Sequence, residues 1–61
     1  MKFDFDPVAD AAYLEIADTT VEESRELQPG IIADYDAQGQ IVGIEILYVS
    51  KRANSPIKQA A

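Results

Sequence analysis

The residues of this sequence that could do chemistry are its carboxylates. The chain of 61 residues contains 11 Asp and Glu, but no His and no Cys. It therefore lacks a thiol nucleophile and an imidazole that could serve as a general base near neutral pH. The same absences exclude disulfides and the usual ligand sets for zinc, haem and iron–sulfur clusters. Any catalysis would rest on carboxylates, Tyr or Lys, and any metal would be a hard cation bound by oxygen.

The carboxylates Asp34, Asp36 and Glu45 are the candidates for a functional site. Together with Gln38 and Gly39 they come close to the pattern of a calcium-binding loop. The flanking segments predict strands, however, whereas the calcium loop of an EF-hand lies between helices. In a hairpin, Glu45 would lie several residues along the strand from Asp36, too far to close a loop around one ion. We therefore expect no metal site and no cofactor, and we interpret Asp36 and Gly39 as turn residues.

Asp34 is predicted to share one face of the sheet with Ile32, Val42 and Ile44. A carboxylate there is either hydrated near the end of the sheet or held by donors, such as turn N–H groups, Arg25 or a tyrosine hydroxyl. We favour a structural role over a catalytic one, because perturbed carboxylates also occur in purely structural networks.

Gly43 falls in the middle of a predicted strand, where glycine is unfavourable. One explanation is the close approach of a ligand or a partner backbone at this position. The other is that Gly43 makes room for Tyr13 or Tyr35 across the sheet, or marks a bulge. We favour the second explanation, in which the glycine serves the fold.

The strands that position these residues follow from the alternation of apolar and polar side chains. Residues 2–6, 11–17, 31–35 and 40–47 each show this pattern and are predicted strands. Residues 21–27 are polar on both faces, which is typical of a strand at a sheet edge, where charge prevents unwanted pairing.

Turns are predicted at three of the four connections between these strands. Asp6 and Asp10 are expected to cap a short turn that closes the first hairpin. Pro29 and Gly30 predict a type II turn, since proline fits its second position and glycine takes the positive φ of its third. Gly39 is expected to close a type I turn in the left-handed conformation, so that a second hairpin forms around it.

The register of this second hairpin predicts which side chains share a face. It places Asp34 opposite Val42, and Ile32 opposite Ile44. One face then carries Ile32, Val42, Ile44 and Ile46, and the other carries Ile31, Tyr35, Ile41 and Leu47. Both faces would be apolar and would need cover, whereas a sheet over one core is polar on one side. A second copy of the chain is the simplest cover, so we expect a homodimer with Ile31, Tyr35, Ile41 and Leu47 at its interface.

The predicted fold is mainly β: an antiparallel meander of four or five strands with a short C-terminal helical segment near Ser55 and Pro56. The chain is expected to form one domain over residues 1–61, with residues 52–61 as a loosely ordered tail. A chain this short buries little of its surface, which again favours association with a second chain.

The net charge of −6 limits the partners of the protein. It repels nucleic acid and anionic lipid, so neither is an expected partner, and it attracts basic protein surfaces. The N-terminus does not read as a signal peptide, and no stretch approaches the roughly 18–20 apolar residues that cross a bilayer. We expect a cytoplasmic protein.

Two motifs resemble a widespread small bacterial family, the domain-of-unknown-function family twenty-two eighty-three. The first, D-P-x-x-D-A-x-Y, begins at Asp6. The second, P-G-[IV]-[IV]-x-D-Y-D-x-x-G-x-[IV]-V-G-[IV]-E-[IL]-L, begins at Pro29. The resemblance implies a compact bacterial protein without an established activity. It also implies a binding or antitoxin role, because genes of the family often sit beside small toxin-like genes.

Two functions from different classes follow. The favoured one is a non-enzymatic protein-binding module whose acidic surface engages a basic partner protein. The alternative is a carboxylate-based hydrolase or a metal-dependent enzyme that uses Asp34, Asp36 or Glu45. A convergence of these carboxylates in one pocket would distinguish the second from the first.

Overall fold

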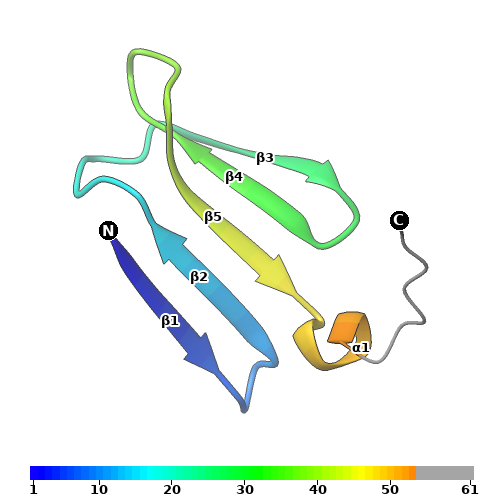
Figure 1. The fold of residues 1–61 in the computed structure, drawn as a ribbon. Helices are drawn as coiled ribbons and strands as arrows, with labels where there is room; N and C mark the ends of the chain where they lie inside the picture. The colour runs from blue at the N-terminus through cyan, green and yellow to red at the C-terminus, as the bar shows by residue number, and fades with distance from the viewer. Residues whose placement is uncertain (54–61) are drawn as a thin grey trace, which may run out of the picture.

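The computed structural model describes residues 1–53, which form one antiparallel sheet of five strands and a short helix (Figure 1). The strands are β1 (Lys2–Asp6), β2 (Ala11–Glu15), β3 (Glu23–Gln28), β4 (Ile31–Tyr35) and β5 (Ile41–Leu47), and the helix is α1 (Val49–Ala53). The prediction of a mainly β fold with a short C-terminal helical segment is confirmed. No helix within the described residues is long and apolar enough to cross a membrane.

The strands lie in the order β1-β2-β5-β4-β3. The prediction of a simple meander was wrong at one connection, because β5 pairs with both β2 and β4 and so occupies the centre. The segment between β2 and β3 therefore carries the chain past β5 and β4 to the far edge. This order suits the composition, since all residues of β3 are exposed and polar or charged side chains dominate it, as expected at an edge.

The turns form as their local sequences predict. Asp6 Oδ1 accepts hydrogen bonds from the N–H groups of Val8 and Ala9, at 3.0 and 3.3 Å, and so caps the turn of the first hairpin. Gly30 and Gly39 both have positive φ, 82° and 80°, a conformation that side chains disfavour. Each of these features depends on a few neighbouring residues.

The second hairpin has a different register from the predicted one. Its turn and the Tyr35–Ile41 pair lie as expected, but the register then shifts by one residue. Asp34 consequently lies opposite Gly43 instead of Val42. Val42 is the extra residue of a β-bulge, and its carbonyl accepts the N–H groups of Ile16 (2.8 Å) and Ala17 (3.1 Å).

The shift changes which residues share a face, because a slip of one residue exchanges the two faces of a strand. Ile32 now lies opposite Glu45, and Ile44 lies opposite Ala33. Leu47 pairs with Ala11 of β2. The predicted grouping of Ile32 with Ile44 was therefore wrong, as was the placement of Leu47 beside Ile31. The hairpin has one apolar face instead of two.

We name the two faces by their side chains. The acidic face carries Lys2, Asp4, Asp6, Ala11, Tyr13, Glu15, Ser24, Glu26, Ile32, Asp34, Gly43, Glu45 and Leu47. The apolar face carries Phe3, Phe5, Ala12, Leu14, Ile31, Ala33, Tyr35, Ile41, Ile44 and Ile46, with Glu23, Arg25 and Gln28 at its β3 edge. Both lists follow from strand alternation and cross-strand pairing.

The interior of the described fold is small. Its buried apolar residues are Ala12, Ala33 and Val42, and no large side chain within residues 1–53 is fully buried. Phe3 and Phe5 are 65% and 48% exposed. A single sheet without a second layer leaves its apolar face open to solvent.

Helix α1 joins the two hairpins at one end of the sheet (Figure 1). Asp10, at φ 56°, accepts hydrogen bonds from Val49 N through its carbonyl (3.1 Å), and from Ser50 N and Oγ through its carboxylate (3.0 and 2.9 Å). Arg52 donates to the carbonyls of Leu47 (3.0 Å) and Pro29 (2.6 Å). Asp10 thus caps this helix as well as ending its own turn.

The C-terminal predictions have a mixed outcome. The helix lies at Val49–Ala53, earlier than the helical turn expected near Ser55 and Pro56, which lies outside the described residues. Arg52, expected at the start of a loose tail, is part of the helix and is held by two hydrogen bonds.

Candidate functional site

The centre of the acidic face is a contact between Tyr13 of β2 and Asp34 of β4, across the intervening strand β5. The Tyr13 hydroxyl donates a hydrogen bond to Asp34 Oδ2 at 2.9 Å. Gly43 of β5 lies between them, opposite Asp34 and paired with Glu15. A Cβ at position 43 would overlap the Tyr13 hydroxyl oxygen and lie 2.7 Å from Cζ. The absence of a side chain at Gly43 therefore lets the tyrosine ring cross the strand, as one of the predicted explanations required.

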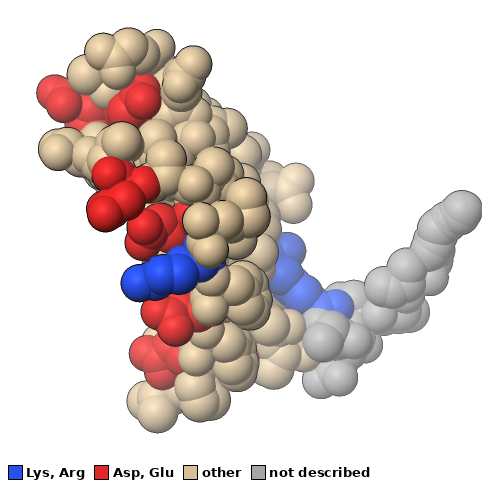
Figure 2. Space-filling model, turned by 60° about the vertical axis from the view of Figure 1, so that its left-hand side comes forward, with Lys and Arg blue, Asp and Glu red and all other residues tan. Residues whose placement is uncertain are grey.

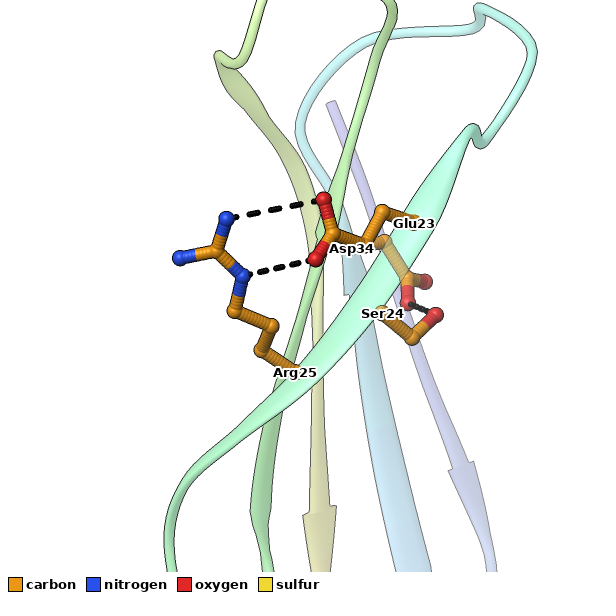
Figure 3. A network of polar contacts seen from close by, with 4 residues as sticks. All are labelled: Glu23, Ser24, Arg25 and Asp34. Carbon is orange, nitrogen blue, oxygen red and sulfur yellow. Dashed lines mark hydrogen bonds and ion pairs between the residues drawn. The ribbon is translucent and has the colours of Figure 1, made fainter.

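The second oxygen of Asp34 is also bound. Ser24 Oγ of the edge strand β3 donates a hydrogen bond to Asp34 Oδ1 at 2.5 Å (Figure 3). Side-chain contacts thus connect β2, β4 and β3 across the sheet. Both carboxylate oxygens accept a hydroxyl, which supports the structural interpretation of Asp34.

The donors of Asp34 were predicted in part. A tyrosine hydroxyl was one of the candidates and is confirmed, whereas Arg25 was another and lies on the opposite face. Arg25 Nε instead pairs with Glu23 at 2.8 Å (Figure 3). The Arg25 guanidinium also lies 5.0 Å from the centre of the Tyr35 ring. Both partners of this ion pair are more than half exposed, so it contributes little stability.

The surroundings of Tyr13 determine its protonation. The hydrogen bond to Asp34 is the largest cause that raises the pKa of Tyr13 above its ordinary value of 10.0. Partial burial and the negative charges of Asp34, Glu15 and Glu45 raise the pKa further. Tyr13 therefore keeps its hydroxyl proton throughout the neutral pH range, and it is poorly suited to act as a base.

The three candidate carboxylates do not converge. Asp36 lies in the turn between β4 and β5, where its Oδ1 accepts the N–H groups of Gln38 and Gln40, each at 2.9 Å. This confirms its interpretation as a turn residue. Asp34 and Glu45 share the acidic face on neighbouring strands, but they are diagonal to each other instead of opposite. Within residues 1–53, no group of three or more acidic residues could hold a metal ion.

Sequence reasoning missed the surroundings of Glu45. The predicted register placed no second acid near it, whereas the bulge at Val42 aligns Glu45 with Tyr13 and brings Glu15 and Asp34 to the same face. The signal that could have revealed this arrangement was Gly43, because a glycine in mid-strand can accompany both a bulge and an overlying aromatic ring.

The acidic face as a whole carries a carboxylate on every strand. Its acidic residues are Asp4, Asp6, Glu15, Glu26, Asp34 and Glu45, and Lys2 is the one basic residue among its strand positions. Figure 2 shows acidic side chains spread along the length of the molecule on the side that it presents. An open depression of about 420 Å³ lies near the first turn, and its polar lining includes Asp4, Asp6, Tyr13 and Glu45.

The fold and the site are those of a small mainly β protein in which a tyrosine crosses a glycine to bind an aspartate on one acidic face of the sheet. The family model described as "Protein of unknown function (DUF2283)" matches residues 2–50. The chain belongs to this family, as its two motifs indicated. The comparison with curated proteins and the comparison with solved structures each returned no match.

Proposed function

We propose that this protein is a non-enzymatic protein-binding module whose acidic face engages a basic partner protein. The observation that carries the proposal is the distribution of carboxylates over all five strands of one open face, with a single lysine among them. Such a face produces a negative potential over its whole area, which accelerates the approach of a basic surface and orients it.

The state of the candidate carboxylates supports binding over catalysis. Asp34 accepts hydrogen bonds from Tyr13 and Ser24, and Asp36 accepts two backbone N–H groups of its own turn. Groups held in this way stabilise the sheet. A hydrolase or a metal enzyme instead requires acids that converge on one reacting atom or ion.

The resemblance to the family adds one partner of suitable chemistry, a small basic toxin. In that case the protein would act as an antitoxin, with its acidic face covering the basic surface of the toxin. The charge of the face supports this role only to the extent that it supports any basic protein partner.

The test is the capture of partners from an extract of cells that encode the protein, followed by mass spectrometry. The face variant is Asp4→Asn with Glu15→Gln, which removes two charges from exposed and half-exposed positions of the acidic face. The matched control is Asp18→Asn with Glu22→Gln, which removes the same charge from exposed positions that precede β3.

The wild type and the control are expected to retain the same basic protein, and the face variant is expected to lose it. Retention should also fall as the salt concentration rises, because screening weakens contacts between exposed charges. A partner that both variants retain equally would contradict the proposal. So would hydrolysis of a model ester or phosphate that disappears in Glu45→Gln.

A further inference from the structure

The described residues leave the apolar face of the sheet open. Phe3, Phe5 and Ile41 on this face are 65%, 48% and 38% exposed. Leu14, Ile44 and the other large apolar side chains of the face are only partly buried. Contiguous apolar surface of this kind marks an interaction site in a water-soluble fold.

The rest of the chain offers little to cover this face. Helix α1 is hydrogen-bonded to Asp10 and to the carbonyl of Pro29, at the end of the sheet where the β1–β2 and β3–β4 turns lie. The sequence beyond Ala53 contains one large apolar residue, Ile57. A single isoleucine cannot fill the area of five strands. The basic partner considered above suits the acidic face, whereas the charges on this face, Glu23 and Arg25, neutralise each other.

We propose that the apolar face binds the apolar face of a second copy of this chain, so that two sheets pack face to face about a twofold axis. The proposal goes beyond the binding function of the acidic face and does not depend on it. Two identical faces can be self-complementary under twofold symmetry. A contact of one residue with a second residue of the other copy is then repeated with the two copies exchanged.

The size of the face fits this occupant. Five strands spaced about 4.8 Å apart, with about five or six residues each at about 3.3 Å, cover roughly 24 by 18 Å. Because side chains project from the sheet, the accessible area of the face is larger than this flat area. It approaches the roughly 800 Å² per partner of a standard protein interface. Sheets that stack in this way lie about 10 Å apart and share one core between them.

The charges are consistent with the same arrangement. The β3 edge of the apolar face carries Glu23 and Arg25, which form an ion pair with each other, so this rim brings no net charge to an interface between two copies. The acidic faces then point outward on both sides of the dimer. Any packing of acidic face on acidic face would bring like charges together, and packing of acidic face on apolar face would bury carboxylates without partners.

The predicted interface is corrected by this placement. Ile31, Tyr35 and Ile41 belong to the apolar face and stay in the proposed interface, together with Phe5 and Ile44. Leu47 belongs to the other face.

The first test is sedimentation velocity of the full chain over a range of micromolar concentrations. Wild type is expected to be a dimer. Phe5→Lys is expected to raise the dimer dissociation constant about thirtyfold or more, because both copies lose a large apolar side chain from the interface and gain a charge there. Val8→Lys, at a turn position that is 95% exposed, is the matched control and is expected to remain dimeric. A wild-type monomer at about 100 μM would overturn the proposal, because that is far weaker than a stable interface of this size requires.

The second test needs no substitution, so it does not depend on the folding of a variant. A sample that mixes isotope-labelled with unlabelled wild-type chains gives nuclear Overhauser effects between copies. These effects are expected among the methyl groups of Ile31, Ile44 and Ile46 and the ring of Phe5. Intermolecular effects confined to the acidic face or to the β1 backbone, or effects from Ile57 to this face within one chain, would overturn the proposal.

Discussion

Tyr13, Gly43 and Asp34 act as one unit, although they lie on three strands and far apart in the sequence. The hydroxyl of Tyr13 reaches Asp34 only because Gly43 leaves the space above its strand empty. Ser24 then completes the contacts of the aspartate from the edge strand. The roles of these residues are therefore coupled, and a change at one should alter the effect of a change at another.

Gly43→Ala tests this coupling. Alanine normally stabilises a strand relative to glycine, but here its Cβ displaces the Tyr13 ring and breaks the bond to Asp34. We expect Gly43→Ala to lower the free energy of unfolding by more than about 1 kcal/mol in the wild type. In a Tyr13→Ala background the same change should be neutral or stabilising. Urea denaturation of the four proteins measures the coupling. An equal loss of unfolding free energy in both backgrounds would show that Gly43 and Tyr13 do not act as a unit.

The pH dependence of stability tests the state of Tyr13. Its pKa is raised in the folded chain, mainly by the bond to Asp34, above the ordinary value of 10.0. In the pH range above that value the unfolded chain loses the proton first, so the stabilisation is present below about pH 10 and is lost as pH rises through the folded pKa. The difference in unfolding free energy between wild type and Tyr13→Phe should shrink on going from pH 8 to above pH 10, by urea denaturation. A difference independent of pH would contradict this assignment.

At the scale of elements, the hairpin of β4 and β5 combines a local turn with a non-local bulge. The turn follows from Asp36 and Gly39, whose positions and conformations match their sequence pattern. The bulge at Val42 instead coincides with the pairing of β5 to β2, since the Val42 carbonyl accepts the N–H groups of Ile16 and Ala17, which directly follow β2. The face of every residue after the bulge depends on this second set of contacts.

Gly39→Val tests the turn. Gly39 has φ of 80°, and no atom beyond its two chain neighbours lies within 4 Å of the position of an added Cβ. The cost is therefore conformational, and we expect a loss of more than about 1 kcal/mol because a β-branched residue resists positive φ. Ala37→Val in the same turn is the control and should change the denaturation midpoint much less. Equal midpoints for Gly39→Val and wild type would exclude the left-handed glycine.

Asp10→Ala tests the attachment of α1. The Asp10 carboxylate accepts hydrogen bonds from the N–H and Oγ of Ser50 at the start of the helix, and Asp10 tolerates its own positive φ better than alanine does. Loss of both contributions should cost about 1–2 kcal/mol. The amide protons of residues 49–52 should also exchange faster with solvent. Asp10→Asn keeps the tolerance for positive φ and should retain part of the protection, whereas protection unchanged in Asp10→Ala would show that the cap is unimportant.

At the scale of the whole molecule, residues 1–53 form a single sheet and a short helix, with two chemically different sheet faces and a very small interior. Ala12, Ala33 and Val42 bury too little apolar area to offset the conformational entropy of folding for so many ordered residues. Folding and association of two copies are then expected to be coupled.

The concentration dependence of thermal unfolding checks this coupling. If a dimer unfolds to two chains, its melting temperature rises with protein concentration by mass action. We expect a clear rise between about 5 and 500 μM for wild type, and a lower melting temperature for Phe5→Lys at each concentration. A wild-type melting temperature that is constant over this range would show that one chain is stable alone.

The sequence by itself determined the features that depend on near neighbours. These are the mainly β class, the approximate strands, the two glycine turns, the cap at Asp6 and the exposed edge strand. They could be predicted because alternation, proline, glycine and short-range capping act within a few residues. Membership of the family followed from two linear motifs for the same reason.

Only the tertiary structure decided how the strands combine. Contacts between distant segments produce four features of the fold. They are the central place of β5, the bulge at Val42, the crossing of Gly43 by Tyr13, and the position of Asp10 at the helix. One inserted residue on β5 exchanged the faces of its remaining positions, because side chains alternate with a period of two. That single shift placed Glu45 with Asp34 on the acidic face, and it placed Ile44 and Ile46 with Ile31 on the apolar face.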